Sequence, residues 1–309
     1  MRGYVLRRLL ALIPTLLLIY TIVFFLMRAT PGGPWDETGT RPVFPEVKAN
    51  LMKKYHLTDP LWKQYVDYLA GALHGDLGPS YRQRGRTVNE IIADFFPISL
   101  RLGLAAMAVA IGCGVPLGFL AAVRQDTRVD RGLMFLAVIG ISTPSFVVAT
   151  VLIVVFGVYL RWVPTSGWAG LLSRQALIPV FALALWPLAA VARYARSSML
   201  DVIRADYVRT AKAKGLRELA IVVRHAAKNA LIPVVTIAGV YLAFVVTGSF
   251  YVESVTGVPG LGRYLVLSIS ARDYPVIMGT TLLLAIIVMV VNLIVDLSYA
   301  LLDPRIRYE

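Results

Sequence analysis

Apolar residues occur along this chain in long runs that short polar stretches separate. Each run is long enough, or nearly so, for a helix that crosses the hydrocarbon core of a bilayer, which takes about 20 residues. A backbone inside lipid must satisfy its own hydrogen bonds, and the runs lack the alternation of barrel strands, so they are predicted to be helices. We predict six spanning helices: Leu9 to Met27, Leu102 to Val123, Leu133 to Leu160, Ala176 to Ala192, Ala230 to Phe250 and Val276 to Leu302.

The first run has two interpretations, a spanning helix or a cleaved signal peptide. Arg2, Arg7 and Arg8 precede it, as either would require. The run is 19 residues long, whereas the apolar region of a signal peptide extends to about 15. No convincing small-residue cleavage site stands between Arg28 and Gly33. We therefore predict a spanning helix.

Basic residues lie unevenly on the two sides of the membrane that six crossings create. Cytoplasmic loops carry the excess of Lys and Arg, so both termini are predicted to be cytoplasmic. The segment between the first two spans is basic too, but long segments cross largely regardless of charge. The basic side holds Arg2, Arg7, Arg8, Arg124, Arg128, Arg131, seven Lys or Arg between Asp201 and Lys228, Arg305 and Arg307; the other short loops hold Arg161, Arg174, Arg263 and Arg272.

The 29–96 segment, which this topology places outside the cytoplasm, has its own organisation. Thr30 to Pro45 is rich in Pro and Gly and is predicted to be irregular. Apolar residues at helical spacing between Pro45 and Leu73, interrupted at Thr58-Asp59-Pro60, predict two short helices. A turn is predicted at Gly75 to Pro79. The segment is expected to form a small cap on the outer face.

Composition agrees with a membrane protein. Of the 309 residues, 58% are apolar and 16% charged, and the mean hydropathy is +0.70, outside the soluble range. The net charge of +13 would suit nucleic acid, but the basic residues flank the apolar runs, so the charge reports topology. The single Cys113 excludes a disulfide built by this chain alone. Prolines predict kinks in the spans: Pro116, Pro144, Pro179, Pro187 and Pro233.

The sequence offers little catalytic chemistry. A phosphate-binding G-x-x-x-x-G-K-[ST] loop is excluded, because no Gly-Lys pair occurs. His56, His74 and His225 stand far apart, so no catalytic metal site is expected. The glycine-rich stretch from Gly257 to Gly262 falls on the outer side and is interpreted as a turn. Asp296, one turn after Asn292, is the only candidate for an ion pathway inside a span, and an interfacial position is the favoured alternative.

The loop from Met199 to Asn229 is longer than the usual helix–helix connection of about 2–8 residues. Its pattern predicts a short helix from Asp206, a turn at Gly215 and a second helix from about Arg217 to Asn229. The small residues Ala211, Ala213 and Gly215 would let another surface approach closely. Two interpretations stay open from the residues: a helix lying on anionic lipid headgroups, or a docking site for a partner protein.

This segment resembles the EAA motif of ABC importer permeases, in which a short coupling helix docks into a groove of the ATPase subunit. The motif E-A-A-x-x-x-G corresponds to Arg209 through Gly215, with Arg209 in place of Glu and Thr210 in place of the first Ala. These departures are similar to those of the dipeptide/oligopeptide/nickel permease family. The resemblance implies ATPase docking by Asp206, Tyr207, Arg209, Thr210, Ala211, Lys212, Ala213, Lys214, Gly215 and Leu216.

The resemblance extends over nearly the whole chain. Its motifs are similar to those of the first of the two permeases of that family, the DppB/OppB type. The motifs that carry it are Arg7-Arg8-Leu9-Leu10 through Pro31-Gly32, Gly75-Asp76-Leu77-Gly78, Pro116-Leu117-Gly118, Ser142-Thr143-Pro144-Ser145-Phe146, Arg224 through Pro233, Val258-Pro259-Gly260-Leu261-Gly262, Arg272-Asp273-Tyr274-Pro275 and Leu302-Asp303-Pro304-Arg305.

The resemblance implies an all-α membrane protein with the type I ABC importer permease fold, located in a bacterial inner membrane. The chain would be no enzyme and would bind no cofactor or metal itself, with ATP and Mg²⁺ on two partner ATPase subunits. A second permease of the DppC/OppC type and an extracytoplasmic solute-binding protein would complete the importer. The expected divisions are 1–28 (tail and first span), 29–96 (extracytoplasmic), 97–302 (five-helix core with the 199–229 coupling loop) and 303–309 (cytoplasmic tail).

The expected function is uptake of di- or oligopeptides, with nickel or another small solute as the alternative within the family. A secondary transporter is the first rival, and it would be expected to show internal repeats and buried charges near the midplane. The sequence shows neither. A membrane sensor is the second rival, and it would need a cytoplasmic output domain, for which little chain follows the last span.

Overall fold

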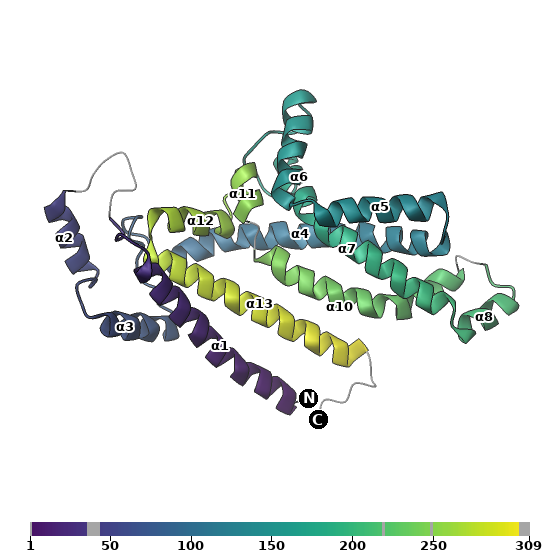
Figure 1. Ribbon diagram of the computed structural model, residues 1–309, viewed down its shortest axis with the longest axis horizontal. Coiled ribbons are helices and arrows are strands. Elements are labelled where there is room, and N and C mark those ends of the chain that lie inside the picture. Colours follow the sequence, from purple (N-terminus) through teal and green to yellow (C-terminus); the bar gives the residue numbers. More distant parts are fainter. Residues whose placement is uncertain (1, 36–43, 218–219, 248–249, 303–309) are drawn as a thin grey trace. The chain divides into compact units, whose positions relative to one another are not determined.

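The computed structural model describes residues 2–35, 44–217, 220–247 and 250–302. Within these ranges the regular secondary structure is helical, and turns and loops connect the helices; the one β-type pairing described is an isolated bridge between Pro79 and Thr87. Figure 1 labels the helices. The chain divides into two compact units, and α4 and α13 contribute to both. Unit 1 holds the described residues up to 98 and those from 260 to 289, and unit 2 holds the others. The prediction of an all-α protein is confirmed.

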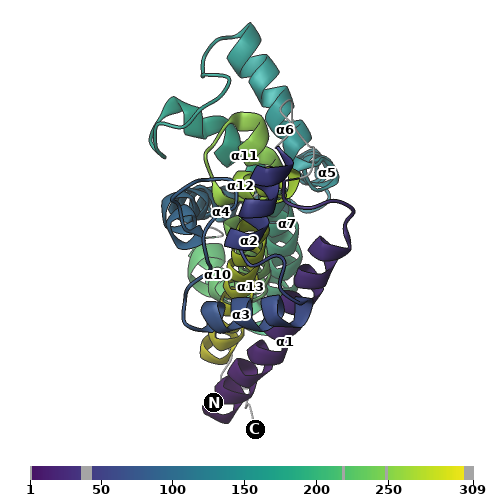
Figure 2. The same cartoon turned by 90° about the vertical axis from the view of Figure 1, so that its left-hand side faces the viewer.

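Unit 1 is built around the helices at the two ends of the chain. Its elements are α1 (Arg2–Ala29), α2 (Pro45–Lys54), α3 (Leu61–Leu73), the start of α4 (Val88–Val123), α12 (Leu261–Ala271) and the first part of α13 (Tyr274–Leu302). Tyr20 and Phe24 of α1 are buried in one cluster with Tyr274 and Met278 of α13. The helix α3 lies across α1, as both views show (Figures 1 and 2). The two short helices predicted between Pro45 and Leu73 are therefore present.

A buried turn closes unit 1. Asp273, between α12 and α13, is 3% exposed. Its carboxylate accepts hydrogen bonds from the Ser80 hydroxyl at 2.5 Å and from the backbone N–H groups of Tyr81 and Arg82 at 3.0 and 3.3 Å. Three donors on one buried carboxylate satisfy a charge that burial alone would make unfavourable. The turn after α3 is thus held against the start of α13.

Unit 2 packs its helices through small residues. It contains the rest of α4, α5 (Arg128–Ser142), α6 (Ser145–Leu152), the π-helix η1 (Ile153–Tyr159), the 3₁₀ turn η2 (Arg174–Ala176), α7 (Leu177–Ile203), α8 (Asp206–Ala213), the π-helix η3 (Ile221–Ala226), α10 (Ala227–Val246), α11 (Phe250–Thr256) and the last part of α13. A Cβ at Gly114 of α4 would stand 2.8 Å from the Leu188 carbonyl of α7. Gly118, one turn on, faces Ala192 and Ala195 of α7 in the same way. This small-xxx-small spacing lets two backbones approach closely, as in membrane helix pairs.

Among the residues that the structure describes, five helices are long and apolar enough to cross a membrane, and a bent pair makes a sixth crossing if it counts as one span. The five are Leu10–Ala29, Val88–Val123, Arg174–Ile203, Ala227–Val246 and Tyr274–Leu297. Six spans were predicted, so the number agrees when the pair is counted once.

The predicted third span, Leu133 to Leu160, is not one straight helix. It consists of two pieces, Arg128–Ser142 and Ser145–Tyr159, bent by 104°. Pro144 causes the break, because a proline lacks the N–H that would continue α5 and forces the residue before it out of the helical region. Thr143 accordingly has φ −95° and ψ 121°. Figure 1 shows α6 turning away from α5.

Two helices extend beyond their apolar runs. The helix α4 begins at Val88, well before Leu102, because Thr87 and Glu90 form a capping box. The Thr87 hydroxyl accepts from the Glu90 N–H at 3.2 Å, and the Glu90 carboxylate accepts from the Thr87 N–H at 3.0 Å. The helix α7 continues to Ile203, so it takes up the first residues of the predicted 199–229 loop.

Candidate functional site

The helix α8 occupies the middle of the 199–229 loop, where the sequence predicts a short helix. It follows α7 after a tight turn in which the Ala205 N–H donates to the Val202 carbonyl at 3.0 Å. Val208 and Ala211 on its inner face are buried against Ile221, with Val202 packed beside them. Four apolar side chains thus attach α8 to the end of α7 and the start of η3.

The outer face of α8 bears charged side chains and makes few contacts with the rest of the described chain. The Arg209 guanidinium lies 3.5 Å from the Asp206 carboxylate, and their side chains are 74% and 96% exposed. An ion pair this exposed contributes almost nothing to stability. Tyr207 is half-exposed, and its hydroxyl accepts a hydrogen bond at 2.9 Å from the Asn229 amide. Thr210, Ala213, Lys214, Gly215 and Leu216 are also exposed.

The C-terminal end of α8 has the cap that the sequence predicts. Gly215 has φ +74°, a backbone conformation that glycine adopts without strain. The Leu216 N–H donates to the Ala211 carbonyl at 3.4 Å, the long bond of a Schellman motif. A Cβ built on Gly215 meets nothing within 4 Å. The glycine is therefore required by the turn and not by crowding within this chain.

Behind α8, a second layer of small and flexible side chains connects the loop to the bundle. Ala122 of α4, Met199 of α7, Ala226 of η3 and Ala230 of α10 form one buried cluster. Val202 packs against both α8 and this cluster, so a continuous set of apolar contacts joins α8 to α4, α7 and α10. The π-helix η3 lies at this junction, and π-helical turns often mark functional positions.

An ion pair joins the start of α5 to the second half of α7, the helix that precedes α8. Arg196 donates from Nε and Nη2 to the two carboxylate oxygens of Asp130, at 2.6 and 2.7 Å. Asp130 also accepts from the backbone N–H of Asp126 at 3.0 Å, and its side chain is 4% exposed. A bidentate arrangement of this kind fixes both distance and orientation. The sequence reasoning missed this pair, since its two partners lie 66 positions apart, just outside two different predicted spans.

The break between α5 and α6 is the second unusual feature of unit 2. A cavity of about 320 Å³ opens there, lined in part by Ser142, Thr143 and Ser145 and by Trp186 of α7. The carbonyls at the end of α5 lack their helical partners, which membrane proteins tolerate where the backbone lines a water-filled or protein-lined path. The break thus brings hydroxyl groups and backbone carbonyls together within a bundle of apolar helices.

The residues that the resemblance assigned to docking are not equivalent in the structure. Ala211 packs inward and supports α8, so it is not available to another surface. Asp206, Tyr207, Arg209, Thr210, Ala213, Lys214, Gly215 and Leu216 are exposed, and the side chain of Lys212 lies outside the described ones. Val208 is an additional residue that matters, as the buried anchor of α8; its spacing of three from Ala211 is the signal that predicts it. Among the described residues no group of three or more His, Cys, Asp or Glu could hold a metal ion.

Comparison with known proteins decides the family. Residues 114–308 match the family described as "Binding-protein-dependent transport system inner membrane component", and residues 1–103 match the one described as "Binding-prot-dependent transport system membrane comp, N-term". The chain belongs to this transport family. It is thus a multi-pass inner membrane component and a permease subunit.

Curated relatives match over the full length. The chain is 43% identical over 308 residues to the oligopeptide transport system permease protein OppB of Haemophilus influenzae, with 100% of both chains covered. It is 44% identical to the dipeptide transport system permease protein DppB of Bacillus subtilis, covering 99% of this chain and 98% of that protein. It is also 44% identical to OppB of Salmonella typhimurium, with 100% of both covered. The resemblance to dipeptide and oligopeptide permeases is confirmed.

The fold agrees with a solved structure. A chain of the inward-facing MetNI methionine ABC transporter superimposes with a TM-score of 0.57, covering 69% of this chain and 97% of that one. At 18% identity this likeness concerns the fold alone. The type I importer permease fold that the resemblance implied is confirmed.

Proposed function

We propose that this chain is one of two permease subunits of an ABC importer for di- or oligopeptides, and that α8 is the helix that docks into its ATPase. The single observation that carries the docking proposal is the asymmetry of α8. Its inner face is anchored by Val208 and Ala211, while Arg209, Thr210 and Ala213 on its outer face are exposed. A surface built in this way is suited to burial by a partner protein.

The charge of the loop supports the same assignment. Between residues 199 and 229 the sequence has seven Lys or Arg and three Asp or Glu. This excess of basic residues favours the cytoplasmic side, where the ATPases of an importer lie. Both termini would then be cytoplasmic, and the 29–96 segment would lie outside, where an extracytoplasmic solute-binding protein delivers its load. The 303–309 tail, outside the described residues, is proposed to be cytoplasmic.

The coupling would pass from α8 into the bundle through the cluster of Ala122, Met199, Ala226 and Ala230. A partner shifts a conformational equilibrium only when it binds the two states differently. We propose that the ATPases, which bind ATP and Mg²⁺, hold α8 differently in their open and closed forms. The broken helix at Thr143 and Pro144 then borders the path that opens, together with the second permease.

Peptide as the transported solute is supported by the relatives, whose names specify oligopeptide or dipeptide transport. The cavity at the α5–α6 break offers what a peptide requires, namely hydroxyls of Ser142, Thr143 and Ser145 for its polar backbone and the Trp186 ring for its apolar groups. Nickel import is tested as the other outcome in the same assay.

The experiment compares two substitutions of the same kind in the assembled importer. Ala213→Trp adds a large side chain on the exposed face of α8, and Ala169→Trp adds it to an exposed position in the loop before α7. Cells that express the importer with either variant are given a radiolabelled dipeptide, a radiolabelled tetrapeptide or ⁶³Ni²⁺. The amount of the chain in the membrane and the ATPase recovered with it are measured in parallel.

We expect Ala213→Trp to remove peptide uptake and ATPase recovery while the chain stays in the membrane, and Ala169→Trp to leave all three unchanged. Normal ATPase recovery and uptake with Ala213→Trp would overturn docking at α8. Uptake of nickel without peptide would overturn the substrate and leave the docking result standing. Uptake that persists without any ATPase would overturn the importer itself.

A further inference from the structure

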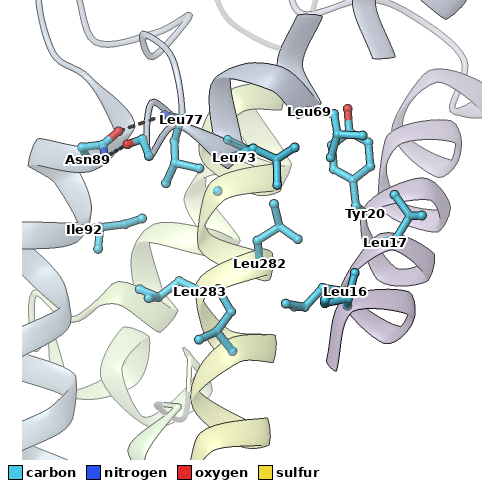
Figure 3. Close-up of a pocket in the computed structure, with 15 residues that line it drawn as sticks. Leu16, Leu17, Tyr20, Leu69, Leu73, Leu77, Asn89, Ile92, Leu282 and Leu283 are labelled. Atoms are coloured by element: carbon cyan, nitrogen blue, oxygen red, sulfur yellow. Dashed lines mark hydrogen bonds between the residues drawn. The ribbon is translucent and has the colours of Figure 1, made fainter. Parts of the chain in front are cut away.

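Unit 1 contains an apolar cavity that is lined by none of the residues assigned above to docking or to the α5–α6 break. It has a volume of about 590 Å³ and lies between α1, α3, the start of α4 and α13. Figure 3 shows Leu16 and Leu17 of α1 on one side and Leu282 of α13 on the other, with Leu69 and Leu73 of α3 beside them. All the residues that line it belong to unit 1.

The walls place this cavity at the depth of the membrane. Its residues on α1 lie within the Leu10–Ala29 span and its residues on α13 within the Tyr274–Leu297 span. Several wall side chains are exposed at its opening, among them Ile13 of α1 at 63% and Leu73 of α3 at 79%. The cavity therefore opens sideways onto the apolar surface that α1 presents to lipid.

The helix α3 runs beside α1 at the level of the hydrocarbon core and does not lie entirely in water. Gln64, in the first turn of α3, accepts hydrogen bonds from Arg28, whereas the Tyr65 hydroxyl is 2.8 Å from that of Thr21. Leu69 and Leu73 reach the level of Tyr20 and Leu17 as cavity walls. Since residues 17 and 28 of a helix are about 16 Å apart along its axis, α3 descends well into one leaflet.

The opposite face of α3 agrees with that position. Trp62, Val66 and Ala70 lie at helical spacing, do not line the cavity and are exposed. A stripe of this kind is typical of a helix that lies in the interface with its apolar face in the acyl region. The roof of the cavity is closed without free polar groups, because the Asn89 side chain donates to the Gly75 carbonyl at 2.7 Å and accepts from the Leu77 N–H at 3.0 Å.

From this geometry we infer that the cavity is a site for the acyl chain of a membrane phospholipid. Water is a poor occupant, since an apolar cavity of about 150 Å³ stays dry and holds one benzene molecule. On that scale this cavity, at about 590 Å³, takes roughly twenty carbon atoms, about the size of one acyl chain. An empty space would forfeit the dispersion contacts of its walls. The hydrocarbon at its opening supplies a chain that fills it.

The apolar side chains that line the cavity favour a phospholipid over a transported solute. A peptide would leave its N–H and C=O groups without hydrogen-bond partners against Leu16, Leu17 and Leu282, which is unfavourable for each buried group. An acyl chain carries no such group. The site would thus attach α3 to α1 and α13 through a lipid, and it does not rest on the proposed transport function.

The test uses the full importer in its native membrane, loaded with a phosphatidylethanolamine that carries a diazirine in its acyl chain. Light attaches the lipid to nearby residues, and peptide mapping finds where. Two variants on α3 form a matched pair: Ala72→Phe fills the cavity, whereas Ala70→Phe adds the same ring on the exposed face. Labelling of α1 at Leu18 and Ile22, which are exposed, serves as the reference.

We expect the wild-type chain to be labelled at Leu69 to Leu73 and at Leu282 to Ile286. Ala72→Phe should reduce labelling of α13 by about tenfold, since a close-packed interior leaves no room for both ring and chain, and Ala70→Phe should not. Absence of label at α13 in the wild type, or equal labelling in the two variants, would overturn the site. So would a crosslink from a cysteine at Leu283 to the second permease, which would show a protein helix in the cavity. If Ala72→Phe fails to assemble, the wild-type labelling alone decides.

Discussion

The turn that holds Asp273 and the loop that carries α8 are both polar segments between helices, and they are stabilised in opposite ways. Asp273 is buried and accepts from one hydroxyl and two backbone N–H groups. In contrast, the Asp206 and Arg209 side chains are 96% and 74% exposed, and α8 is held mainly by Val208 and Ala211 on its inner face. The first turn is satisfied by its own unit, and the second leaves a surface for another molecule.

This difference distinguishes polar groups that stabilise the fold from polar groups that are available to bind a partner. A buried carboxylate with a complete set of donors contributes to the stability of its own unit, because its removal leaves donors without an acceptor. An exposed charged helix contributes little to stability, so its sequence is free to serve a partner. Substitutions in the first turn should therefore change stability, and substitutions in the second should change transport.

The largest effect is expected at Asp273. Replacement with Ala leaves the Ser80 hydroxyl and the Tyr81 N–H buried without their acceptor, and should lower stability by about 3–5 kcal/mol. Thermal unfolding of the purified importer in detergent measures this. Asp67→Ala, on the exposed face of α3, is the control and should leave the midpoint unchanged. Equal midpoints for Asp273→Ala and the control would refute the structural role of the turn.

The ion pair between Asp130 and Arg196 is an intermediate case, since the Arg196 side chain is 25% exposed. Asp130→Asn, Arg196→Gln and the double variant form a cycle whose coupling energy should be about 2 kcal/mol. Arg128→Gln, at an exposed position of the same first turn, is the matched control. A coupling near zero would mean that α5 and α7 are held by packing alone.

Substitutions of Gly215 test whether the loop that carries α8 serves transport. Valine is strained at φ +74°, at about 1 kcal/mol, whereas asparagine of similar size tolerates this conformation. We expect Gly215→Val to lose uptake. If Gly215→Asn retains uptake, the loss of uptake in Gly215→Val is due to backbone strain in the turn. If both variants lose uptake, a partner approaches this position closely, because no atom of this chain lies within 4 Å of the added Cβ. Normal uptake in both would count against docking at this end of α8.

The smallest effect is expected for the exposed pair of Asp59 and Lys63 before and within α3. The hydrogen bond from the Lys63 ammonium, at 2.7 Å, lowers the pKa of Asp59, and the same bond raises the pKa of Lys63. The Asp59 contribution is present above the unfolded pKa and is lost as pH falls through the folded one; the Lys63 contribution is lost only as pH rises through its own folded pKa.

Lys63→Met should therefore shift the thermal midpoint slightly and by the same amount from about pH 5 to pH 9, with the shift declining as pH falls below about 4. Thermal scans of the two proteins across this range provide the measurement. A shift that varies around neutral pH would show that another group controls this corner of unit 1.

Local signals in the sequence predict much of the fold and part of the site. The apolar runs indicate where the chain crosses the membrane, because hydrocarbon thickness and backbone hydrogen bonding constrain each span by itself. Gly215 predicts the end of α8, and Thr87 with Glu90 marks the start of α4, although the apolar run suggested a later one. Pro144 indicated a kink, but its 104° angle depends on what α6 packs against.

The sequence by itself thus determined the number of crossings, the basic loop and the short helix within it, since each depends on residues a few positions apart. Only the tertiary structure decided that Asp273 meets Ser80 and that Asp130 meets Arg196, pairs separated by 193 and 66 positions. It also turned Ala211 inward and enclosed the cavity beneath α3. These features arise from packing between distant helices, and a pattern along one helix does not specify which neighbour its faces will meet.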